Sequence, residues 1–131
     1  MLTLLAGACS SQPTEARKPV HPVRGKVLYK GQPAKGAFVL FAPLNEPAEN
    51  PDPRPRGTVA EDGSFVLGTY ESEDGAPAGE YTVAITWEGG VLPDGREEPP
   101  DKLLGRYNVS NSRLRATVKE GPNELPPFQL Q

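Results

Sequence analysis

From Val23 onward, apolar and polar residues alternate with a period of two over short stretches of the chain. This alternation is typical of β-strands that bury one face and expose the other. In the clearest stretch, Tyr81, Val83, Ile85 and Trp87 share one face, and threonine and glutamate lie on the other. The expected strands cover residues 23–29, 37–43, 56–60, 65–70, 81–88, 113–119 and 124–130. Seven short strands separated by turns predict an antiparallel β-sandwich.

Turn and proline positions refine this arrangement. Asp62-Gly63 is a dipeptide that supplies the backbone conformation of a tight hairpin turn, so it is expected to join two paired strands. Pro126 and Pro127 have no backbone N–H to donate, and the last strand is therefore expected at a sheet edge or with a bulge. Gly25 lies on the inward face of the first strand, where a missing side chain lets another element approach closely.

One irregular insert, residues 89–112, interrupts the strands. Within it, residues 99–105 predict at most one short helical turn, with Asp101 as its cap and Gly105 as its stop. The chain has 16 prolines among 131 residues, which excludes a helical bundle because an interior proline costs a helix about 3 kcal/mol.

The composition narrows the class of protein. The length fits one domain, and 14 basic against 17 acidic residues give a net charge of −3 with no long basic run, which argues against a nucleic-acid partner. One cysteine and one histidine exclude a disulfide scaffold and a metal site built from several such ligands. No cofactor is expected.

Residues 1–9 are apolar and uncharged, and they end in small residues before the only cysteine, Cys9. Eight residues of helix rise about 12 Å, too little to cross a membrane. Leu5-Ala6-Gly7-Ala8-Cys9 resembles a bacterial lipobox, which implies a remnant of a signal peptide and a diacylglyceryl group on Cys9. Residues 10–22 are then a disordered tether that reaches at most about 40 Å.

The body, residues 23–131, resembles carboxypeptidase regulatory-like domains at several points. The resemblance is carried by Val23-Arg-Gly-Lys-Val-Leu-Tyr at the start, Ala60-Glu-Asp-Gly-Ser-Phe in the centre, Pro77-Ala-Gly-Glu-Tyr-Thr-Val before the longest strand, and the ending from Leu114 to Phe128. It implies a transthyretin-like (prealbumin-like, Ig-like) sandwich, and a non-catalytic module similar to small lipoproteins of planctomycete-type bacteria.

Few residues point to catalysis. His21 is the only histidine and lies between two prolines, so it is expected to be an exposed side chain of the tether. Hydrolytic triads and two-histidine metal sites then lack a partner within the body. The chain also ends without the Tyr-Arg-Gly-Ser motif of the hydrolases that share the transthyretin fold. A transthyretin-fold enzyme is thus a remote alternative, and the chain is expected not to be an enzyme.

Three groups of residues are candidates for binding. Tyr70, Trp87 and Tyr107 suggest a platform for stacking sugars, although burial is the first expectation for Trp87 and Tyr107 is the more open of the three. Acidic residues at 71–74 suggest weak calcium binding, or simply solvated loop charge. Basic residues on the outward face of the strand 113–119 suggest contact with anionic polysaccharide or lipid, or again a solvated face: these are Arg113, Arg115 and Lys119.

These observations together predict a monomeric lipoprotein module of the bacterial envelope, facing the periplasm or the outer membrane. It would be held to the membrane through Cys9 and would have a structural or ligand-binding role toward an envelope protein or polysaccharide. The alternative is a carbohydrate- or calcium-binding accessory protein at the cell surface.

Overall fold

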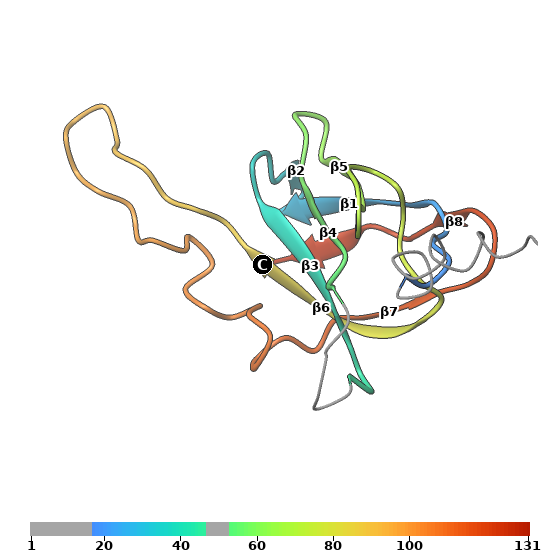
Figure 1. The fold of residues 1–131 in the computed structure, drawn as a ribbon. Helices are drawn as coiled ribbons and strands as arrows, with labels where there is room; N and C mark the ends of the chain where they lie inside the picture. The colour runs from blue at the N-terminus through green and yellow to red at the C-terminus, as the bar shows by residue number, and fades with distance from the viewer. Residues whose placement is uncertain (1–16, 47–52) are drawn as a thin grey trace, which may run out of the picture.

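The computed structural model describes residues 17–46 and 53–131. This part of the chain is all β and contains no helix. Its nine strands form two sheets that face each other as a sandwich (Figure 1). No helix long and apolar enough to cross a membrane occurs among the described residues. The predicted fold class, a β-sandwich, is confirmed, and the two additional strands are only two residues long.

The first sheet is organised around β1, which has neighbours on both edges. Its strands are β1 (Val23–Tyr29), β2 (Gln32–Pro33), β5 (Ser64–Val66), β8 (Asn123–Glu124) and β9 (Phe128–Leu130). β2 and β5 pair antiparallel with β1, whereas β8 and β9 pair parallel with it. The fully antiparallel sandwich expected from the sequence is therefore wrong at the C-terminal strands. The chain crosses from the second sheet before β8, so no hairpin sets the direction of β8 and β9.

The second sheet is antiparallel throughout, in the order β4, β3, β6, β7. Its strands are β4 (Arg56–Thr58), β3 (Phe38–Pro43), β6 (Gly79–Thr86) and β7 (Arg115–Val118). β3 and β6 pair over six residues, from Phe38 opposite Thr86 to Pro43 opposite Tyr81. β4 and β7 are the two edges of this sheet.

The core lies between the sheets and consists of the apolar residues that the alternation assigns to the inward faces. The fully buried large side chains include Val23, Val27, Val39, Phe41, Phe65, Leu67, Val83 and Ile85. One departure concerns β6, where Thr82 and Ala84 are also buried on the face expected to be outward. β6 lies between β3 and β7, so side chains of both neighbouring strands cover that face as well.

Two local predictions are confirmed. The last predicted strand lies at a sheet edge, because β8 and β9 pair only with β1 among the described strands, and the strand is interrupted at Pro126 and Pro127. Gly25 is indeed where another element comes close: a Cβ built on it would lie 2.5 Å from Cζ of Phe65.

The Asp62-Gly63 turn forms, with the Asp62 carboxylate accepting the Ser64 N–H at 3.0 Å and Gly63 at a φ of 90°. The two strands that it joins nevertheless belong to different sheets, and beyond the turn an isolated bridge between Arg56 and Gly68 connects their far ends. The expected hairpin is therefore wrong beyond the turn itself.

Residues 88–101 form a two-armed excursion that projects from the sandwich where β6 ends (Figure 1). Its arms are joined by bridges from Glu88 to Asp101 and from Val91 to Glu97. At 99–105, where at most one short helical turn is expected, the chain forms hydrogen-bonded turns, with the Asp101 carboxylate accepting the Leu103 N–H as a cap and Leu104 and Gly105 at positive φ, 56° and 76°. Leu103 is fully buried and fixes the base of this insert to the core.

Candidate functional site

The two sides of the sandwich differ. On one side, Arg56 of edge strand β4 exchanges two backbone hydrogen bonds of 2.9 Å with Gly68, which follows β5, so the backbone bridges the two sheets at this point. On the other side, edge strand β7 faces the C-terminal segment across an open groove of about 470 Å³. We call this feature the β7 groove; its lining residues are Arg113, Leu114, Arg115, Ala116, Thr117, Leu125, Pro126, Pro127 and Phe128.

The backbone of β7 offers hydrogen-bonding groups at this groove. Leu114 accepts from the Val83 N–H at 2.9 Å, so its carbonyl points toward β6. Successive residues of a strand direct their backbone groups to opposite edges. The N–H and C=O groups of Arg115 and Thr117 therefore point away from β6, and within the described residues no hydrogen bond to them is formed.

The side chains of the β7 groove combine an apolar floor with positive charge. Leu114, Ala116 and Leu125 are half-buried against the core. Arg113 and Arg115 are exposed, and in the described part of the chain neither forms an ion pair. The Arg115 Nη1 donates to the Leu114 carbonyl at 3.1 Å, so this guanidinium stays beside the strand. The sequence placed Leu114 and Ala116 in the core and gave no sign that this side of the sandwich is open.

Trp87 is not a core residue, because β6 ends one residue before it and its side chain is half-buried. Its Nε1–H donates to the Lys35 carbonyl at 2.8 Å, and the Tyr29 ring lies edge-on at 5.6 Å. The ammonium of Lys102 lies 4.0 Å from the centre of the indole ring. A pocket of about 340 Å³ surrounds this contact between the ring and the chain's own cation; its lining residues are Tyr29, Trp87, Glu98, Pro99 and Lys102.

Tyr70 and Tyr107 also have partners within the chain. The Tyr70 hydroxyl accepts from the Lys18 N–H at 2.9 Å, and the Tyr107 hydroxyl accepts from the Gln131 N–H at 3.3 Å. Tyr107 is half-buried against the core rather than open. No ring contact joins Tyr70, Trp87 and Tyr107, and Trp87 instead contacts Tyr29. The structure thus does not bring the three candidates together as one platform.

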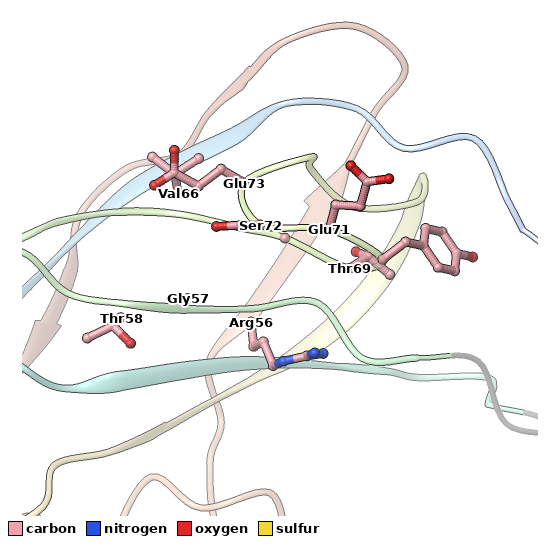
Figure 2. Close-up of a pocket in the computed structure, with 10 residues that line it drawn as sticks. Arg56, Gly57, Thr58, Val66, Thr69, Glu71, Ser72 and Glu73 are labelled. Atoms are coloured by element: carbon pink, nitrogen blue, oxygen red, sulfur yellow. The ribbon is translucent and has the colours of Figure 1, made fainter.

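The acidic loop at 71–74 is organised around Asp74. Its carboxylate accepts the backbone N–H groups of Thr69, Tyr70 and Glu71 at 2.7, 3.2 and 3.0 Å. The loop and β4 line a polar pocket of about 470 Å³, and Figure 2 shows the side chains of Glu71 and Glu73 extending away from each other. Among the described residues, no group of three or more His, Cys, Asp or Glu is placed to hold a metal ion.

His21 is attached to the sandwich and is not an exposed side chain of a tether. It exchanges two backbone hydrogen bonds of 2.9 Å with Ala76, and its Nδ1 accepts from the Gly121 N–H at 3.2 Å. The hollow beside it is lined by Lys18 and Glu120 but by no arginine. Contacts with the sandwich therefore begin before the boundary expected at Val23, since the Lys18 N–H also donates to the Tyr70 hydroxyl. Cys9 and residues 10–16 lie outside the described residues.

Asp101 has the densest set of contacts among the carboxylates of the insert. It accepts the N–H groups of Trp87, Leu103 and Gly105 at 2.9, 3.0 and 2.9 Å. Burial by itself raises the pKa of this carboxyl, but the three amides and Arg106 outweigh burial, so the net pKa is lowered. Asp101 thus joins the end of β6 to the base of the insert as a structural group.

No family model and no curated protein matches the chain. Among solved structures, a DUF3823 family protein from Parabacteroides merdae is similar, with 16% sequence identity and a TM-score of 0.40. The similarity covers 84% of this chain and 45% of that one, so the chain spans about half the length of that protein. The chain itself, over its described residues, is a small β-rich domain.

Proposed function

We propose that this chain is a non-catalytic binding module of a bacterial envelope lipoprotein and that it holds a protein partner in the β7 groove. The observation that carries the proposal is the groove itself. Along one edge of the sandwich it combines half-buried apolar side chains, free backbone groups and two arginines that form no ion pair within the described residues. Apolar surface next to unsatisfied polar groups is typical of interaction sites.

The placement in the envelope rests on Leu5-Ala6-Gly7-Ala8-Cys9, which resembles a lipobox. A diacylglyceryl group on Cys9 supplies the two acyl chains that stable anchoring needs. The proposed family, carboxypeptidase regulatory-like with a transthyretin-like fold, is supported by the order of its turns. Asp62-Gly63 forms its tight turn, and Gly79 begins the strand that contains Tyr81.

The test compares two positions for a photo-crosslinking amino acid in cells of the source bacterium. Pro126 is exposed and lines the β7 groove, whereas Lys26 is exposed on β1 outside it. We expect the same protein adduct from position 126 in repeated experiments and none from position 26. Equal labelling from both positions would contradict the groove as the binding site.

The anchor is tested separately in the same cells. We expect Cys9→Ser to move the protein from the membrane fraction to the soluble fraction, and intact-mass measurement to find acyl chains on Cys9 of the wild type. An unmodified Cys9 in the membrane fraction would contradict the lipoprotein assignment.

A further inference from the structure

We infer that the β7 groove binds an extended acidic segment of its partner as an additional strand beside β7. The inference rests on the proposed binding function and specifies the chemistry of the partner. In such a complex, the partner continues the antiparallel sheet β4, β3, β6, β7 by one strand, so that main-chain hydrogen bonds supply affinity and side chains supply specificity.

The first reason is the free edge of β7. The outward N–H and C=O groups of Arg115 and Thr117 are spaced as a strand needs for pairing with a neighbour. This edge is limited at its end by Asn123, whose Oδ1 accepts the Lys119 N–H at 2.9 Å. The free edge therefore lies beside the groove and is not continued into the turn that follows β7.

The second reason is that each face of an added strand would contact a different kind of surface. Alternate side chains of that strand would extend toward the apolar floor formed by Leu114, Ala116 and Leu125. The remaining side chains would lie beside Arg113 and Arg115 on the outer face of the sheet. The groove thus fits a segment in which apolar residues alternate with Asp or Glu.

The third reason excludes a second copy of this chain as the occupant. Antiparallel pairing of β7 with β7 of another copy would place the basic side chains of this outer face, Arg113, Arg115 and Lys119, of the two copies on adjacent strands. Like charges on adjacent strands are destabilising, whereas opposite charges are stabilising. An acidic segment is therefore favoured over self-association, and the outward arginines protect the edge from pairing with itself.

The probe is a fluorescein-labelled peptide of about eight residues, within the usual length of a strand, in which valine alternates with glutamate. Two control peptides separate the contributions: one has the same composition arranged in two blocks, and the other replaces glutamate by lysine. Fluorescence anisotropy with the full chain should show binding of the alternating acidic peptide, weaker by about tenfold or more for each control.

Variants identify the site. Thr117→Pro removes an N–H that points away from β6, so β7 stays paired with β6 while its free edge loses a donor and gains a bulky ring. Thr58→Pro is the matched control, because the N–H of Thr58 on edge strand β4 likewise points away from its partner β3. We expect about a tenfold loss of peptide affinity for Thr117→Pro and no change for Thr58→Pro.

A second variant keeps the test decisive if Thr117→Pro fails to fold, as judged by circular dichroism. Arg113→Glu/Arg115→Glu should weaken binding of the acidic peptide by about tenfold or more and restore binding of the lysine peptide. Arg24→Glu, on the exposed face of β1, should change neither.

Three outcomes would overturn the inference. They are an absence of peptide binding at low salt, equal binding of the alternating and block peptides, and full affinity for the alternating peptide in folded Thr117→Pro. Either of the last two results would indicate a surface for polyanions such as acidic polysaccharide. None of these results changes what is expected from photo-crosslinking at position 126. A groove that crosslinks a protein but rejects the peptide would retain the proposed function and reject the added strand.

Discussion

At the scale of single residues, a close contact in the core joins Gly25 and Phe65. The Phe65 ring covers the α-carbon of Gly25 and is itself stacked on Phe128, with ring centres 6.2 Å apart. Phe65 is 2% exposed, so its ring is enclosed in the core. The absence of a side chain at position 25 thus lets β1 and the core ring pack in direct contact.

We expect Gly25→Ala to lower the free energy of unfolding by about 2 kcal/mol, because the added methyl group would lie 2.5 Å from Phe65 Cζ and would overpack the core. Urea denaturation measures this change. Gly90→Ala is the control, since nothing lies within 4 Å of the position of its Cβ, and it should stay within about 0.5 kcal/mol of the wild type. Equal stability of the two variants would contradict the packing at Gly25.

Asp101→Asn is a second change at this scale. It replaces one carboxylate oxygen by an amide NH₂, so the Gly105 N–H loses its acceptor, and we expect a loss of about 1–2 kcal/mol at pH 7. The control Asp94→Asn concerns an exposed pair with Arg96 at the tip of the excursion and should change stability by less than about 0.5 kcal/mol.

The pH dependence of that loss follows from the lowered pKa of Asp101. Its carboxylate contributes stability fully above the ordinary pKa of 3.8, and this contribution disappears as the pH falls through the lower value of the folded state. The difference between wild type and Asp101→Asn should therefore be largest at neutral pH and should shrink in urea melts below about pH 4. A difference that stays constant across this range would contradict the role of the charged form.

At the scale of elements, β9 shows how three residues can close a sheet. Phe128 and Leu130 point into the core, Gln129 points outward, and all three pair with β1. Leu130→Ala should lower the free energy of unfolding by about 3 kcal/mol through the cavity that it leaves. Gln129→Ala, on the exposed face of the same strand, should be close to neutral in the same thermal or urea melts. Similar losses for both variants would contradict burial of the Leu130 side chain as the source of the stability.

The elements that the sequence predicts well are those whose environment is local. The alternation in β1, β3 and β7 reports directly which face is buried, and the prolines at 126 and 127 report the interruption between β8 and β9. Local patterns do not report pairing partners. The parallel pairing of β8 and β9 with β1, and the separation of β4 and β5 into different sheets, depend on contacts between distant parts of the chain.

For the candidate site residues, too, the sequence predicts local patterns but not contacts between distant segments. Trp87 matches the period of β6, yet the strand ends at Thr86 and the ring contacts Tyr29 and Lys102 from other segments. The β7 groove was not predictable, since Leu114 and Ala116 carry the pattern of core residues and only the position of the second sheet leaves them half-buried. His21 follows the polar composition of a tether, and its docking depends on Ala76 and Gly121.

At the scale of the whole molecule, the order in which the strands are assembled has a consequence for biogenesis. Val27 on β1 pairs with Phe128 on β9, a separation of 128 − 27 = 101 residues. During synthesis, one edge of β1 therefore has no pairing partner until the residues up to β9 have been made. Contacts between residues so far apart in the sequence form slowly. The first sheet is therefore completed only when the C-terminal segment is available to pair with the first strand.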